Sequence, residues 1–178
     1  MFKKTLLLTG LAVLMTAQVN AQSISLGPQL GYFKTKDADK AAYMGGAALR
    51  LKLMGLGVEA SINYRQEKYA NDALTVRSWP VMVTGLIYPL PIVYGAVGAG
   101  WYNTTFHYDQ NRFPLLKDET SRKVGWHFGG GVELPLGSVK LTGDVRYVFL
   151  NYNFKGVPGG SKLKSNFYVI TVGFLFGL

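Results

Sequence analysis

The sequence has no cysteine, only two histidines, and 10 acidic residues against 19 basic ones in a chain of 178. The lack of cysteine excludes disulfide scaffolds, thiol nucleophiles and zinc sites with cysteine ligands. His107 and His127 are too few and too far apart in the sequence for a metal centre, so we expect neither a metal nor a cofactor. Glycine is abundant, with 22 residues, and aromatic residues make up 13%, which favours β-structure over a helical bundle.

The N-terminal apolar run is too short for a membrane-spanning helix, which needs about 20 residues. Two lysines precede the run, and Ala21 is a small residue that suits signal-peptidase cleavage before Gln22. We therefore predict a cleaved secretory signal peptide over residues 1–21 and one mature domain over residues 22–178. Cleavage lowers the net charge from +9 to +7, which still suits an anionic surface as a partner.

Residues 78–106 carry no formal charge but do not have the character of a helix. Pro80, Pro89 and Pro91 interrupt them, and their glycines lower the helix propensity further. We expect two strands here, joined by a turn at Pro89–Pro91.

Alternation of apolar and polar residues is the main signal in the rest of the chain, and it predicts strands. It recurs in eight stretches separated by turn-forming residues. The predicted strands are Ser23–Phe33, Tyr43–Leu53, Leu56–Arg65, Val76–Tyr88, Ile92–Phe106, Val124–Leu134, Val139–Phe149 and Asn166–Leu178.

One face of each stretch holds large apolar residues, and the other holds mainly glycine, serine, threonine, asparagine and a few charges. Only the fourth stretch is apolar on both faces. For it we group Ser78, Met82 and Thr84 with the polar faces, and the inverse assignment stays open. The apolar face of that stretch then contains Trp79, Val81, Val83 and Ile87.

Eight alternating strands can form a soluble barrel with the apolar faces inside or a membrane barrel with them outside. The small residues of the polar faces suit a crowded lumen better than a water-exposed surface. The connections also alternate between short and long, as in outer-membrane barrels. The short ones are Met54-Gly55, Pro89–Pro91 and Pro135–Ser138, and the long ones are 34–42, 66–74, 107–123 and 150–165. We therefore predict an all-β fold, an eight-stranded antiparallel up-and-down transmembrane β-barrel.

An aromatic residue occurs at the same end of each apolar face, as an interfacial girdle at the headgroup level requires. The residues of this predicted outer girdle are Tyr32, Tyr43, Tyr64, Trp79, Trp101, Trp126, Phe149 and Tyr168.

Four segments resemble a known family, namely YGAVGAGWY at 94–102, GWHFGGGVELPL at 125–136, GDVRYVFL at 143–150 and the C-terminal TVGFLFGL. They are similar to the outer membrane protein β-barrel domain family, the small OmpX/Ail-type barrels often labelled porin family proteins. The resemblance covers residues 22–178 and implies location in the outer membrane of a Gram-negative-type bacterium. It also implies a C-terminal signal for the barrel-assembly machinery, with Leu178 standing where the family usually has Phe or Trp. The residues matching that signal are Thr171, Gly173, Phe176 and Leu178.

The charged residues of the polar faces are expected to pair inside the lumen and fill it. A two-residue turn at Met54-Gly55 places Arg50 opposite Glu59. A four-residue turn at Pro135–Ser138 places Glu133 opposite Lys140, Gly129 opposite Asp144 and His127 opposite Arg146. The predicted lumen network is Arg50, Lys52, Glu59, Arg65, Glu133, Lys140, Asp144 and Arg146.

These features favour a structural or surface-interaction role through the outer loops, such as adhesion or contact with lipopolysaccharide. A small porin or solute channel is the alternative. An outer-membrane lipid-modifying enzyme is less favoured, because His107 and Asp109 are the only catalytic candidates near the outer rim, and we predict that the protein is not an enzyme. We expect a monomer with no nucleic-acid partner. The expected anion contacts are Lys155, Lys162 and Lys164.

Overall fold

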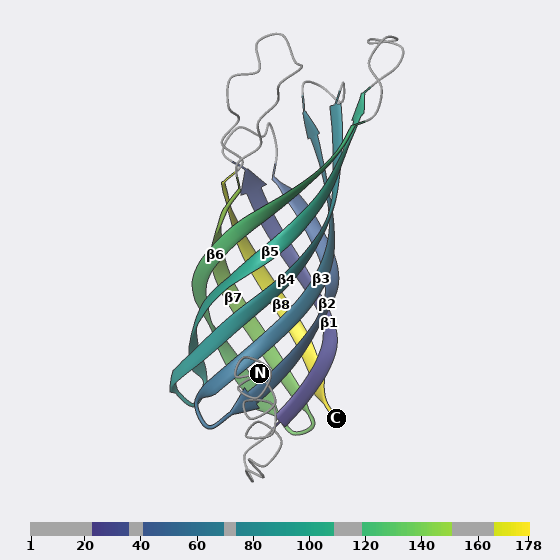
Figure 1. The fold of residues 1–178 in the computed structure, drawn as a ribbon. Coiled ribbons are helices and arrows are strands. Elements are labelled where there is room, and N and C mark those ends of the chain that lie inside the picture. The colour runs from purple at the N-terminus through teal and green to yellow at the C-terminus, as the bar shows by residue number, and fades with distance from the viewer. Residues whose placement is uncertain (1–22, 36–40, 70–73, 109–118, 151–165) are drawn as a thin grey trace, which may run out of the picture.

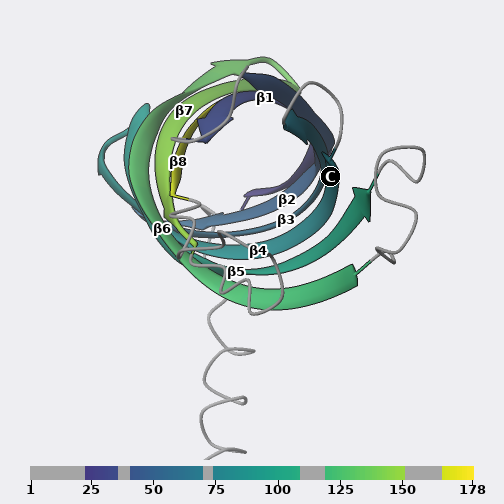
Figure 2. The ribbon, with the colours of Figure 1, turned by 90° about the horizontal axis from the view of Figure 1, so that it is seen from above.

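The computed structural model describes residues 23–35, 41–69, 74–108, 119–150 and 166–178, and the predicted signal peptide lies outside them. Eight antiparallel strands form a closed barrel in which each strand bonds to the next and β8 bonds to β1 (Figures 1 and 2). Within the described residues, no helix is long and apolar enough to cross a membrane. The strands are β1 (Ser23–Thr35), β2 (Ala42–Leu53), β3 (Leu56–Tyr69), β4 (Leu74–Leu90), β5 (Val93–Tyr108), β6 (Glu119–Leu136), β7 (Val139–Phe149) and β8 (Phe167–Gly177).

The two ends of the barrel differ. One end, which we call the turn end, carries the short connections β2–β3, β4–β5 and β6–β7 and the C-terminus (Figure 1). At the other, which we call the loop end, β3 to β6 continue past the predicted strand limits. β6 begins at Glu119 rather than Val124, and Glu119 still pairs with Phe106 of β5. The apolar pattern stops earlier because it follows the apolar surroundings of the barrel, whereas backbone pairing between strands continues beyond them.

All eight strands expose one face and bury the other. In β4, where the sequence left the facing open, Ser78 and Thr84 are fully buried at 0% exposure, while Trp79 is 54% exposed. The predicted assignment is therefore confirmed. The outward positions between the turn end and the aromatic residues are all apolar or glycine, because the polar residues of every strand fall on the inward face.

The turn between β6 and β7 differs from the prediction. It contains two residues, Gly137 and Ser138, rather than four, and Leu136 pairs with Val139. Gly137 has a φ of 66°, a left-handed conformation that favours glycine and permits the tight turn.

This shorter turn moves β7 by two residues against β6. The predicted pairs of Glu133 with Lys140, Gly129 with Asp144 and His127 with Arg146 are therefore wrong. The actual partners are Glu133 with Thr142, Gly129 with Arg146, Gly131 with Asp144, His127 with Val148, and Pro135 with Lys140.

Pro135 sits inside β6 because its missing N–H removes no strand bond. The N–H of Glu133 donates to Ile92 on the β5 side, and alternation aims the nitrogen of Pro135 to that same side. β5 begins at Val93, which pairs with Val132, so it has no residue opposite Pro135. A proline therefore did not mark the start of the turn.

The β4–β5 connection also differs slightly from the prediction. Leu90 pairs with Val93 across Pro91 and Ile92, and the register shifts between Ile87 and Leu90. Pro89 therefore lies inside the strand, at an irregularity of the kind where proline is tolerated.

Candidate functional site

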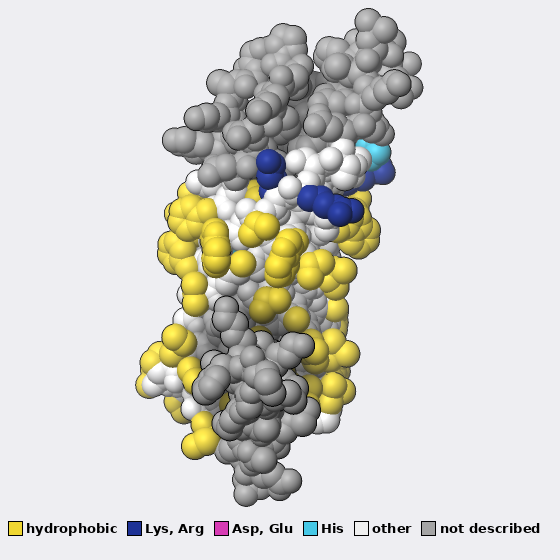
Figure 3. All heavy atoms as spheres, in the orientation of Figure 1, with side chains coloured by type: hydrophobic (Ala, Val, Ile, Leu, Met, Phe, Trp, Pro, Cys, Tyr) yellow, Lys and Arg dark blue, Asp and Glu magenta, His cyan; other side chains and the backbone are white. Residues whose placement is uncertain are grey.

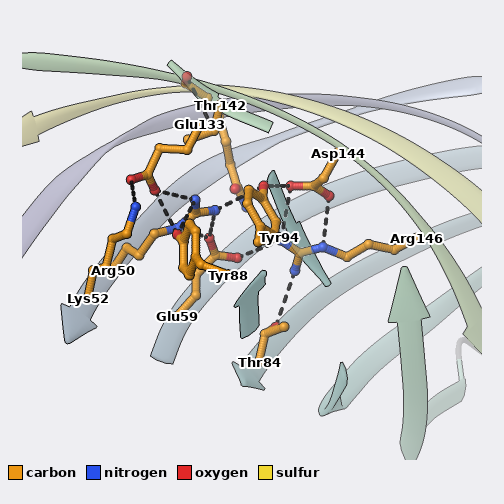
Figure 4. A network of polar contacts seen from close by, with 12 residues as sticks. Arg50, Lys52, Glu59, Thr84, Tyr88, Tyr94, Glu133, Thr142, Asp144 and Arg146 are labelled. Atoms are coloured by element: carbon orange, nitrogen blue, oxygen red, sulfur yellow. Dashed lines mark hydrogen bonds and ion pairs between the residues drawn. The ribbon is translucent and has the colours of Figure 1, made fainter. Parts of the chain in front are cut away.

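The inward side chains form two layers. Toward the turn end they are a network of ionised groups and tyrosines, which we call the charged network (Figure 4). Toward the loop end they are mainly apolar, and we call them the apolar cluster. The buried members of this cluster are Phe33, Met44, Val76, Met82, Tyr102, Val148, Leu150, Phe167 and Val169.

Arg50 of β2 is the first centre of the charged network. Its Nε donates to Glu59 Oε2 at 3.0 Å, and its Nη1 donates to Glu133 Oε2 at 2.9 Å. Tyr88 OH donates to the same Glu133 oxygen at 2.8 Å, and Lys52 Nζ donates to Glu133 Oε1 at 3.0 Å. Because β2 and β6 lie on opposite sides of the barrel, the contacts of Arg50 and Lys52 with Glu133 cross the lumen.

Arg146 of β7 is the second centre. Its Nη2 donates to Glu59 Oε1 at 2.8 Å, and its Nε donates to Asp144 Oδ1 at 2.8 Å. Its Nη1 donates to Thr84 Oγ1 at 3.2 Å. Tyr94 OH donates to Asp144 Oδ2 at 2.9 Å. Glu59 thus joins the two arginines into one network.

The charges of this network balance. Arg50, Lys52 and Arg146 face Glu59, Glu133 and Asp144, which are the only acidic residues whose side chains the structure describes. All three carboxylates are at most 5% exposed. Each charge of this network therefore has an opposite partner and additional hydrogen bonds, as burial of charge requires. Space is equally limited, because a Cβ on Gly131 would lie 2.5 Å from that of Asp144 and 2.8 Å from Tyr94 Cζ.

The structure brings together six of the eight predicted lumen residues. Lys140 lies apart, partly exposed, with Nζ 2.6 Å from Ser23 Oγ. Arg65 lies apart in the apolar cluster. Sequence reasoning missed Tyr88. It lies an even number of residues from Ser78 and Thr84 on β4, so strand alternation places its side chain inside the barrel.

Arg65 is buried at 4% exposure and surrounded by aromatic rings. Its guanidinium carbon lies 4.4 Å from the ring centroid of Phe167, 5.2 Å from that of Phe33 and 5.6 Å from that of Tyr102. No described carboxylate forms an ion pair with it, and its Nη1 has no hydrogen-bond partner among the described residues.

The eight predicted girdle residues lie on the outer surface toward the loop end. Tyr32 pairs with Tyr43 and Trp126 with Phe149, and the rings of Tyr64 and Trp79 lie 4.6 Å apart. The other girdle residues on neighbouring strands are offset by two residues in the strand register. Because the strands are tilted, their side chains stay at a similar depth.

Basic side chains follow beyond this ring. Figure 3 shows a band of hydrophobic side chains with Lys and Arg gathered above it. The exposed basic residues at this level are Lys34, Arg77 and Arg122.

Comparison with known proteins identifies the family. The family described as "Outer membrane protein beta-barrel domain" matches residues 5–176. The chain belongs to this family. It is therefore a bacterial outer-membrane barrel, and because such barrels place short turns in the periplasm, the turn end is the inner end and the loop end the outer end.

Solved outer-membrane barrels share the fold at low identity. A major outer membrane protein from Thermus thermophilus has a TM-score of 0.61 at 13% identity, covering 89% of this chain and 100% of that one. Neisserial surface protein A has 0.58 at 10%, covering 88% and 97%. Ail of Yersinia pestis, in complex with the heparin analogue sucrose octasulfate, has 0.53 at 16%, covering 88% and 97%. No curated protein sequence matches the chain.

The predicted C-terminal signal coincides with the closing strand. Thr171 and Gly173 face inward, and Phe176 and Leu178 are exposed on the outer face. Leu178 N donates to Ile24 O at 3.0 Å, which ties the terminus to β1. Lys155, Lys162, Lys164 and Asp109 lie outside the described residues, and among the described ones no group of acidic residues and histidines could hold a metal ion.

Proposed function

We propose that this outer-membrane barrel is closed to solutes and serves a structural or surface-interaction role through its outer end. The observation that carries the proposal is the charge-balanced network from Arg50 on β2 to Glu133 on β6. A permeating ion would have to displace paired charges from a lumen that eight strands make only about as wide as its own side chains.

The outer end is suited to anionic partners such as lipopolysaccharide phosphates or acidic polysaccharides. Lys34, Arg77 and Arg122 are exposed there, whereas the acidic side chains that the structure describes are all buried in the lumen. A protein of the same fold, Ail of Yersinia pestis, was solved with a sulfated heparin analogue, which supports this partner class. We also propose that the barrel-assembly machinery recognises β8 and that the protein acts as a monomer.

Planar-bilayer recording tests the closed lumen. Purified wild-type protein is expected to give no steady current. The double variant Tyr88→Ala/Tyr94→Ala removes two rings from the charged network and is expected to leak. Tyr43→Ala removes a ring of the same size from the outer surface and should stay silent. Stable conductance steps from the wild type would favour a small porin instead.

A further inference from the structure

The lumen of the outer half contains a cation that the charged network does not neutralise. Arg65 lies six residues beyond Glu59 on β3, about 20 Å along a strand that rises ~3.3 Å per residue. The carboxylates of the network are already held by Arg50, Lys52 and Arg146. Among the described residues, Arg65 therefore contacts aromatic rings and no carboxylate.

Cation–π contacts offset only part of the cost of burying a guanidinium, which has five N–H donors to satisfy. Arg65 Nη1 is enclosed and has no hydrogen-bond partner among the described residues. The preceding inward positions of β3 repeat this pattern, because Asn63 Nδ2 and Ser61 Oγ are also buried and have no hydrogen-bond partner in the part of the chain that the structure describes. One wall of the lumen thus presents a row of unused donors that begins with a positive charge.

Apolar side chains surround this row. Phe33 and Phe167 pack against each other with ring centroids 5.7 Å apart, and Met44 and Met82 belong to the same cluster. Methionine side chains are unbranched and adaptable, so they can repack around a guest molecule. The combination of hydrogen-bond donors, one positive charge and an adaptable apolar surround defines the chemistry of a ligand.

We propose that the outer half of the lumen binds an amphipathic anion, a carboxylate or similar acid with a short apolar chain. The acid group accepts hydrogen bonds from Arg65 and Asn63, and the chain packs among Phe33, Met44 and Phe167. A small inorganic anion would lose its hydration and has no apolar chain whose burial could offset that cost. A neutral apolar molecule would leave Arg65 unpaired. Binding from the outer end requires no passage through the charged network.

Methionine-methyl NMR of the protein in nanodiscs of uncharged lipid tests this site, with octanoate as the probe. Met44 and Met82 lie in the cluster, and Met54 lies at the opposite end in the exposed turn, where it serves as an internal reference. Octanoate is expected to shift the Met44 and Met82 methyl signals saturably and leave Met54 unchanged. Octanamide, which has the same chain without the charge, and inorganic phosphate, which has no chain, should each bind at least about tenfold more weakly.

Two variants separate the site from adsorption to the lipid surface. Arg65→Gln should weaken octanoate binding about tenfold or more. Arg65→Lys keeps the charge but not the paired N–H donors of the guanidinium, so its affinity should lie between those of the wild type and Arg65→Gln. Arg77→Gln removes an exposed outward arginine and should change nothing. Equal affinity for octanoate and octanamide, unchanged binding by Arg65→Gln, or no saturable shift at Met44 and Met82 would each overturn the proposal. An unshifted Met54 signal and fast migration of unboiled protein in detergent gels establish that each variant is folded.

Discussion

The two halves of the lumen bury their arginines in opposite ways. In the inner half, Arg50 and Arg146 share Glu59 and are matched by further carboxylates. In the outer half, Arg65 is held among three aromatic rings without a described carboxylate. Both halves are lined by buried side chains, but among the described residues only those of the inner half balance their charges. The inner half is thus organised for closure and stability, whereas the outer half retains a charge for which the described residues supply no counterion.

The largest expected effect comes from opening the ring at its inner end. Deleting residues 176–178 removes the backbone bonds that Gly177 and Leu178 donate to Ser138 and Ile24, together with both terminal apolar positions. The truncated chain is expected to stay in the periplasm, because an open sheet edge is not tolerated in lipid. Membrane fractionation measures this, and normal outer-membrane levels would contradict the role given to β8.

Unbalancing the inner network should destabilise the barrel strongly. Glu59→Ala leaves three cations facing two carboxylates, at a cost of about 3–5 kcal/mol. Glu59→Ala combined with Arg50→Ala leaves Lys52 with Glu133 and Arg146 with Asp144, so charge balance returns. Urea unfolding in lipid vesicles should therefore show the single variant to be less stable than the double one. A double variant as unstable as the sum of two single losses would mean that packing, not charge balance, dominates.

Replacing each arginine by methionine compares the two halves directly. Arg146→Met breaks ion pairs with Glu59 and Asp144 and should cost several kcal/mol, roughly 3–5. Arg65→Met removes a buried cation that has no described carboxylate partner and places an apolar side chain of similar volume among the rings. The free energy of unfolding should therefore fall by less than about 1 kcal/mol, or increase. Equal losses in the two variants would show that the rings alone stabilise Arg65 as well as carboxylates stabilise Arg146.

The wall of the barrel could be predicted from the sequence more fully than the contacts in its lumen. Alternation located all eight strands and their facing, because apolar surroundings outside and a crowded lumen inside impose a period of two. The pair of Arg50 with Glu59 followed from the tight turn at Met54-Gly55, where both residues have positive φ. The β6–β7 register did not follow, because Pro135 suggested the start of a turn, whereas the actual turn begins two residues later, at Gly137.

Contacts across the lumen were beyond sequence reasoning for a physical reason. Arg50 meets Glu133 from strands that are not neighbours, so no hairpin register relates them. The same holds for Arg146 and Glu59. Alternation along each strand shows which side chains point inward. Which of them meet across the lumen depends on the tilt of the strands and the length of the side chains. Arg65 was therefore grouped with the other lumen charges, although its position along β3 separates it from them.

The smallest effect concerns the exposed charges of the outer end. The sequence between β7 and β8 contains Lys155, Lys162 and Lys164 and no acidic residue, and β7 ends and β8 begins at the outer end. Changing all three lysines to glutamine should weaken binding to vesicles that contain anionic lipid, by about 1 kcal/mol for each lysine that touches the surface, and the loss should shrink as salt is raised. Lys140→Gln at the inner end is the matched control and should leave binding unchanged, because its side chain contacts Ser23 at the turn end of the barrel. Vesicle co-sedimentation between low and physiological salt measures both variants, and unchanged binding of the triple variant would assign any anion contact to Lys34, Arg77 and Arg122 instead.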